Sequence, residues 1–160
     1  MQYGICNLSI VSLRLEPSDK SELISQALYG DYFKVLEQRK SWSKIRFAFD
    51  KYEGWINNKQ YIEITEEQYK NLNQSKPKLS LDLIEYVQDK NNQLYAIPLG
   101  AELKGLSILN HNFDGNYITA DIDQEYLERI DMYISSAIVD NGEGVLHPKI
   151  EPDAPEVETI

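Results

Sequence analysis

Alternating apolar and polar residues, interrupted by turn residues every few positions, dominate the first 64 residues of the chain. Within residues 3–15 the alternation slips by one position at Val11–Ser12, which predicts a bulge or a break between two short strands. The apolar face predicted on the two sides of this slip consists of Leu8, Ile10, Leu13 and Leu15.

The same pattern predicts further strands. Residues 21–28, 32–36 and 42–47 are strand-like, and another strand opens at Trp55–Ile56. Turn chemistry separates them, because proline fixes φ while glycine, serine and aspartate favour tight turns. Short strands joined by frequent turns are typical of a barrel or a sandwich, so we expect a small all-β barrel over residues 1–64. The predicted turns lie at Glu16–Asp19, Tyr29–Asp31 and Asp50–Gly54.

A short helix and a linker are predicted over residues 65–78. Thr65 and Gln68 have the spacing of a capping box, which predicts a helix that runs to about Asn73. The acidic pair Glu66–Glu67 then lies in the first helical turn, where the helix dipole favours negative charge. This position explains the pair without a functional role.

A second small β-rich unit is predicted over residues 79–122. After it, residues 123–140 place apolar side chains on one face of a helix that Asp123 caps. Residues 141–160 form an acidic tail that contains proline, and we expect this tail to be disordered. The strands of the second unit are expected at 79–87, 94–99 and 117–120.

Composition narrows the possible partners. The 160-residue chain has a formal net charge of -10, part of which lies in the tail. An acidic chain repels a phosphate backbone, so we expect no nucleic acid partner. The 11 tyrosines favour strands and half-buried faces, in agreement with a mainly β fold.

Cys6, His111 and His147 are the chain's only cysteine and histidines. A lone cysteine forms no internal disulfide, and the spacing of these residues matches no metal site, so we expect no metal and no cofactor. Cys6 lies on the first predicted strand, where a buried inert thiol is more typical than a nucleophile. His111 lies in a predicted turn, where an ordinary surface histidine is expected.

The N-terminal segment Met1–Cys6 has neither the basic region nor the apolar run of a signal peptide. No stretch approaches the roughly 18 apolar residues of a membrane-spanning helix. The sequence therefore predicts a soluble cytoplasmic protein without a membrane partner.

Three segments resemble the bacterial SH3 (SH3b) domain. Leu13–Ser18 is similar to the family's V-R-x-x-P-S, and Ala27–Glu37 is similar to its L-x-x-G-x-x-x-x-V-L-E. Trp42–Arg46 and Tyr52–Ile56 are similar to its W-x-K-V and G-W-V. The segments occur in the family's order and at its spacing. The resemblance covers roughly residues 3–64 and implies an SH3-like small barrel.

The segments Y-G-I-C-N, E-P-S-D-K-S-E and Y-E-G-W-I-N-N-K-Q resemble more specifically the first SH3b domain of cytoplasmic NlpC/P60 cysteine peptidases. These are γ-D-glutamyl-L-diamino acid endopeptidases of cell-wall (peptidoglycan) recycling, in which two SH3b domains precede the catalytic domain. Ile97–Leu103 is similar to the P-x-G-x-x-L segment of the second SH3b domain. The resemblance therefore implies that residues 79–122 form a second SH3b-like unit.

The catalytic motifs of that family do not occur in this sequence. Neither the D-C-S-G-F nucleophile motif nor the Y-x-W-G-G-type segment before it is found. A cysteine nucleophile needs a base beside it, so we expect no catalytic residues and no enzymatic activity on this chain. Three alternatives stay open: a truncated paralogue, a fragment of a longer gene, or a stand-alone module.

Four aromatic residues are the candidates for substrate binding. In the resembled peptidases a tyrosine just before the G-W pair helps to hold the free amino end of the substrate. Tyr52 matches that position, although Glu53 stands where those relatives often have proline. Trp42, Trp55 and Tyr29 are candidates for an aromatic groove on the barrel surface. The competing interpretation is structural, with Tyr52 packing on its hairpin neighbours and the tryptophans anchoring a small barrel.

Two functions remain as hypotheses. In the first, the chain is a non-catalytic SH3b module that shapes the recognition of murein peptides with a free N-terminal L-Ala. Its partner is then an NlpC/P60 catalytic domain in cis or in trans. In the second, the chain is a stand-alone SH3-like module that binds a protein or peptide ligand and has no cell-wall role.

Overall fold

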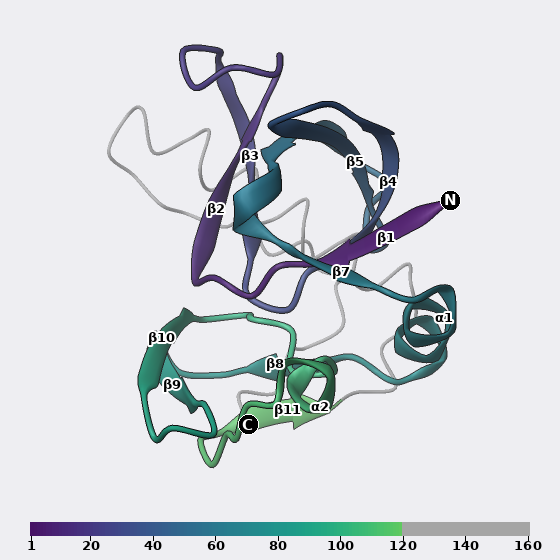
Figure 1. The fold of residues 1–160 in the computed structure, drawn as a ribbon. Helices are drawn as coiled ribbons and strands as arrows, with labels where there is room; N and C mark the ends of the chain where they lie inside the picture. The colour runs from purple at the N-terminus through teal and green to yellow at the C-terminus, as the bar shows by residue number, and fades with distance from the viewer. Residues whose placement is uncertain (120–160) are drawn as a thin grey trace, which may run out of the picture. The chain divides into compact units, whose positions relative to one another are not determined.

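The computed structural model describes residues 1–119 (Figure 1). The predicted helix over 123–140 and the predicted tail over 141–160 lie outside the described residues. The described part is built mainly from short strands, which confirms the predicted fold class of a mainly β, SH3-like chain with short helices.

The N-terminal strands form one curled, seven-stranded antiparallel sheet (Figure 1). Its strand order is β3-β2-β6-β5-β4-β1-β7, so the first strand lies between two strands that follow it much later in the chain. A short 3-10 helix, η1 (Asn58–Gln60), joins the last two strands. The strands are β1 (Gln2–Ile5), β2 (Ile10–Arg14), β3 (Leu23–Leu28), β4 (Tyr32–Gln38), β5 (Trp42–Phe47), β6 (Glu53–Asn57) and β7 (Ile62–Ile64).

The interior of the curled sheet is packed with apolar side chains. Phe33 is fully buried and meets Phe47 and Tyr61 edge to face, with ring centroids 6.2 and 5.2 Å apart. Each such buried side chain stabilises the fold by about 1.5–3 kcal/mol relative to an exposed one. The other buried members of this cluster are Cys6, Val11, Leu13, Ala27, Val35, Ile45 and Ile56.

The apolar face predicted for the first segment is wrong in part. Strand β2 passes through Val11–Ser12 without a break, and its register shift lies instead between Leu13 and Arg14. The inward positions of this strand are therefore Val11 and Leu13, because successive side chains point to opposite faces. The other three predicted members, Leu8, Ile10 and Leu15, are exposed.

The predicted capping box is confirmed. Helix α1 (Glu66–Gln74) begins after Thr65, whose Oγ1 accepts the Gln68 N–H at 3.1 Å while Gln68 Oε1 accepts the Thr65 N–H at 2.9 Å. Two buried residues of the helix, Tyr69 and Leu72, pack on β1 and β7 of the sheet. The Tyr69 and Tyr3 rings lie 4.5 Å apart. The helix therefore covers the end of the sheet where β1 lies.

The predicted strand over 79–87 is wrong as a single element. Its first part, β8 (Lys78–Ser80), pairs with β11 (Tyr117–Thr119), whereas β9 (Ile84–Gln88) pairs with β10 (Leu94–Pro98). The chain must bend between the two parts because they belong to different two-stranded sheets. A one-turn helix, α2 (Leu106–Leu109), lies in the connection between β10 and β11.

The second group of strands, β8 to β11 with their connections, packs on the turn between β3 and β4. Tyr29 of this turn shares a buried cluster with Val87, Ile97, Ala101 and Leu103. Its carbonyl accepts the Glu102 N–H at 3.0 Å. Lys104 adds a second tie, because its Nζ donates to the Tyr32 hydroxyl at 3.0 Å and to the Leu72 carbonyl at 2.9 Å.

Candidate functional site

The two tryptophans share the outer face of the curled sheet. Strand β5 buries Ser43, Ile45 and Phe47, so Trp42 and Lys44 point outward. Trp55 of β6 lies directly opposite Lys44 and is therefore on the same outer face. Trp42 is half-buried at the start of β5, whereas Trp55 is only 6% exposed.

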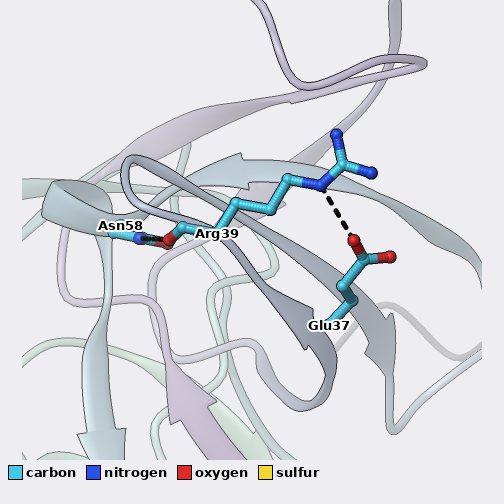
Figure 2. Close-up of polar contacts among 3 residues, drawn as sticks. All are labelled: Glu37, Arg39 and Asn58. Atoms are coloured by element: carbon cyan, nitrogen blue, oxygen red, sulfur yellow. Dashed lines mark hydrogen bonds and ion pairs between the residues drawn. The ribbon is translucent and has the colours of Figure 1, made fainter.

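Arg39 covers the buried tryptophan. The Arg39 guanidinium lies over the Trp55 ring, 4.7 Å from its centroid, which is a cation–π contact. Its Nε also donates to Glu37 Oε1 at 2.8 Å (Figure 2). The ring of Trp55 is thus a support for an arginine and has little area left for a ligand.

The Asn58 side chain, held by the buried Ser43, fixes the hairpin that carries Arg39. The Asn58 side-chain Nδ2 donates to the Arg39 carbonyl at 2.9 Å (Figure 2). Asn58 is held in turn by Ser43, whose Oγ donates to Asn58 Oδ1 at 2.6 Å and lies 2.9 Å from the Tyr61 hydroxyl. Ser43 is fully buried, so these bonds satisfy a polar atom that would otherwise destabilise the interior.

Tyr52 lies at the other end of the β5–β6 ladder. It precedes β6, whereas Trp42 pairs with Asn57 at the end of that strand. The Tyr52 backbone closes the loop, since its N–H donates to Asp50 Oδ1 and its carbonyl accepts the Phe47 N–H, both at 3.0 Å. Its side chain is 43% exposed and available to a ligand.

Tyr29 lies neither on the outer face with the two tryptophans nor in the loop that carries Tyr52. Its side chain is 1% exposed, and its hydroxyl lies 2.6 Å from His111 Nδ1. Burial raises the pKa of Tyr29 and lowers the pKa of His111, so the two groups meet in their neutral forms. His111 lies half-buried between the rings of Tyr29 and Tyr95, which corrects the expectation of an ordinary surface histidine. The four aromatic candidates therefore occupy three separate places.

Cys6 is fully buried on the barrel side of the β3–β4 turn. Its Sγ donates to the Leu8 carbonyl at 3.3 Å. Burial raises the pKa of the Cys6 thiol to about 12, so almost no thiolate is present near neutral pH. This environment is that of a structural thiol.

We predict that Cys6 resists alkylation in the folded chain. At pH 8, iodoacetamide should label it at least about 100-fold more slowly than in urea, because burial excludes the reagent and suppresses the thiolate. Mass spectrometry of timed samples measures both rates. Equal rates in the two conditions would contradict the buried-thiol environment.

Comparison with known proteins places these residues within one recognisable domain. Residues 13–60 match the family model described as the bacterial dipeptidyl-peptidase SH3 domain. Over these residues the N-terminal barrel matches a bacterial SH3 domain. The matched segment of this SH3 domain contains Tyr29, Arg39, Trp42, Tyr52 and Trp55. The match is to an SH3 domain, which is not a catalytic domain.

Solved structures of similar fold include an NlpC/P60 family protein from Bacillus cereus ATCC 10987, with 13% sequence identity and a TM-score of 0.52. The likeness covers 63% of this chain and 46% of that protein, so this chain spans about half of its length. No curated protein matches the sequence.

None of the helices within residues 1–119 has both the length and the apolar character needed to cross a bilayer. Over the same residues, no three side chains of the His, Cys, Asp and Glu types gather as metal ligands.

Sequence reasoning missed Arg39 and Asn58. Arg39 lies in the polar segment between two predicted strands, which the pattern identifies only as a turn. A cation at a hairpin tip, three residues before a tryptophan, is the one local signal that pointed to it. Nothing local indicates that its guanidinium reaches Trp55, because that contact depends on the pairing of β5 with β6.

Proposed function

We propose that the bacterial SH3 domain is a non-catalytic recognition module for murein peptides of the γ-D-Glu-diamino acid class. It acts in the cytoplasm beside an NlpC/P60 catalytic domain that is supplied in cis or in trans. The observation that carries this proposal is the match of residues 13–60 to the SH3 domain of bacterial dipeptidyl-peptidases. The fold likeness to an NlpC/P60 family protein supports the same assignment.

The proposal includes a second SH3b-like unit over residues 79–122. The likeness to the NlpC/P60 protein covers 63% of this chain, which is more than the first 64 residues contain. The second group of strands is also tied to the first by the Tyr29–Glu102 hydrogen bond and the Lys104 contacts. Both points favour a paired arrangement, in which the second unit supports the first.

Tyr52 is the residue of the proposed site with the most accessible ring among the four aromatic candidates. An exposed tyrosine gives a ligand an apolar face and a hydroxyl at a small cost in side-chain entropy. Its loop is closed by backbone bonds that need no tyrosine side chain. Tyr52→Ala therefore removes the ring with little effect on the loop.

We predict that Tyr52→Ala weakens binding of the tripeptide L-Ala-γ-D-Glu-diamino acid by about 10-fold or more, the effect of losing one well-packed aromatic contact. Amide NMR titration of the full chain measures the affinity and should show shifts at Tyr52 and its neighbours. Tyr117→Ala is the matched control, because this tyrosine is similarly exposed but belongs to β11. The control variant should bind like the wild type.

The rival function is a protein interaction module without a cell-wall role. One observation favours it: the outer face of the β9–β10 hairpin carries exposed apolar side chains and no charged ones. Contiguous exposed apolar surface commonly marks a protein contact. If millimolar tripeptide leaves every amide unshifted, the murein proposal is contradicted and the rival is favoured. The exposed side chains include Ile84, Tyr86, Leu94 and Ala96.

A further inference from the structure

Arg39 is an exposed arginine that is held at several points. Its N–H donates to the Trp42 carbonyl at 2.8 Å, and its carbonyl accepts from Asn58 Nδ2 at 2.9 Å. Its guanidinium lies 4.7 Å from the Trp55 ring centroid, and Nε donates to Glu37 at 2.8 Å. Backbone and side chain are therefore both fixed.

The end of the guanidinium fork remains accessible. Figure 2 shows that the contact with Glu37 is drawn to Nε and that neither Nη atom has a drawn contact. Among residues 1–119, no acceptor hydrogen-bonds to either Nη atom. The Arg39 side chain is 55% exposed. A planar pair of N–H donors in this state matches the two oxygens of a carboxylate.

Because Arg39 is already held in place, its side chain loses little conformational entropy when a ligand binds. A free surface arginine samples many rotamers and loses that freedom when it binds. Trp55 and Glu37 have already restricted the side chain, and Asn58 has restricted the backbone. Burial of Ser43 behind Asn58 makes the support part of the domain interior. The arginine is preorganised for a ligand.

The surroundings of Arg39 favour an anion. Lys44 and Arg14 are the two cross-strand neighbours of Trp55, and Lys40 is exposed beside Arg39 at the hairpin tip. Glu37, which pairs with Arg39 and lies opposite Lys44, is the acidic side chain here, so Arg14, Arg39 and Lys44 leave a local excess of cations although the chain as a whole has a formal net charge of -10. The half-buried Trp42 lies on the same outer face, and its carbonyl accepts the Arg39 N–H at 2.8 Å. The combination suits a carboxylate attached to a peptide.

We propose that Arg39 is the carboxylate-binding residue of the SH3 domain and that the ligand is a peptide with a free carboxylate, packed against Trp42. The inference rests on the proposed function, because a D-Glu residue linked through its γ-carboxyl group keeps a free α-carboxylate. Arg39 and Tyr52 lie at opposite ends of the β5–β6 ladder, so the two contacts can be tested separately.

The test compares two ligands on the full chain by titration calorimetry. One is the tripeptide L-Ala-γ-D-Glu-diamino acid, and the other is the same tripeptide with its carboxylates converted to carboxamides. The wild type should bind the carboxylate form at least about 10-fold more tightly, as expected for a charge-assisted pair. Arg39→Gln should remove this preference, whereas Arg39→Lys should keep only part of it, since lysine has the charge without the fork.

Lys40→Gln is the matched control. It removes the same charge from the same hairpin tip, so the carboxylate preference should stay within about 2-fold of the wild type if orientation by Trp55 is what matters. An equal loss in Lys40→Gln and Arg39→Gln would overturn the inference in favour of unspecific attraction. Thermal unfolding of each variant verifies its fold, and Arg39→Lys gives the answer if Arg39→Gln does not fold.

The remaining outcomes distinguish a failure of the Arg39 carboxylate site from a failure of the proposed murein-peptide recognition. If the wild type binds the tripeptide and Arg39→Gln keeps the full preference for the carboxylate form, the inference fails while the proposed function stands. If the wild type binds neither form, both fail together. Loss of the preference in Arg39→Gln alone, with tripeptide binding retained at a weaker level, supports both.

Discussion

Replacing Gly30 by alanine should destabilise the folded chain by about 3 kcal/mol. Gly30 has φ +84°, a conformation that costs a residue with a Cβ roughly 1–2 kcal/mol. A Cβ at this position would also overlap the backbone carbonyl of Glu102. Neither backbone can yield easily, because the adjacent Tyr29 carbonyl accepts the Glu102 N–H and the Gly30 N–H donates to the Cys6 carbonyl at 2.8 Å. Overpacking of this kind adds about 1–3 kcal/mol.

Gly100 offers a matched control for Gly30. Its φ is +81°, nearly the same as that of Gly30, but a Cβ there would have no atom within 4 Å. Gly100→Ala should therefore lose only about 1–2 kcal/mol, from backbone strain alone. Urea denaturation of both variants measures the free energies of unfolding. Equal losses would mean that contact with Glu102 contributes nothing to the effect.

Replacing Asp31 by asparagine should stabilise the chain at pH 8 by up to about 4 kcal/mol. Burial, together with the nearby carboxylates of Glu102 and Asp50, raises the pKa of the Asp31 carboxyl to about 7, although the hydrogen bond from the Leu28 N–H at 2.8 Å acts to lower it. A raised pKa means that ionisation opposes folding, by about 1.4 kcal/mol for each unit of difference from the unfolded chain. Asparagine removes that ionisation and can still accept the Leu28 hydrogen bond through Oδ1.

The pH dependence of this effect has a definite sign. Between pH 4 and pH 7 the unfolded chain has lost the Asp31 proton while the folded chain still holds it, so stability falls as the pH rises. Wild type and Asp31→Asn should have similar stability near pH 4 and should diverge up to about pH 7. Urea denaturation at pH 4, 6 and 8 measures this. Parallel pH profiles for the two proteins would contradict the environment assigned to Asp31.

Asp89 provides a control of the opposite sign. Its carboxylate accepts hydrogen bonds from the Gln93 N–H, the Asn91 N–H and the Tyr95 hydroxyl, at 2.8–3.1 Å, and these bonds lower the pKa of Asp89. Ionisation of Asp89 therefore favours folding. Asp89→Asn should reduce stability at pH 8, where Asp31→Asn increases it.

Local patterns predicted much of the barrel correctly. The alternation over residues 42–47 indicated a strand, and the structure has this strand as β5 (Trp42–Phe47). The Thr65–Gln68 spacing indicated a helix start, because both hydrogen bonds of a capping box form within four residues. Such features depend on neighbours in sequence, so the sequence alone is sufficient to identify them.

The errors lie where distant strands decide the outcome. The bulge or break predicted at Val11–Ser12 assumed that the slip in the pattern disturbs the strand there, whereas β2 pairs with β3 through these residues and shifts register only between Leu13 and Arg14. The strand predicted over 79–87 is divided because its two parts pair with different partners. Register and pairing are properties of two strands at once, and a local pattern describes only one of them.

For the candidate site too, some features could be predicted from the sequence and others depend on strand pairing. The sequence by itself determined that the chain contains a small β barrel with SH3 motifs, and it located the aromatic residues from which a site could be built. Only the tertiary structure decided their surroundings. It buried Tyr29 against His111, placed Trp55 beneath Arg39 and left Tyr52 exposed at the far end of the ladder. The physical reason is that burial, cation–π contact and preorganisation arise between residues that strand pairing brings together from distant parts of the chain.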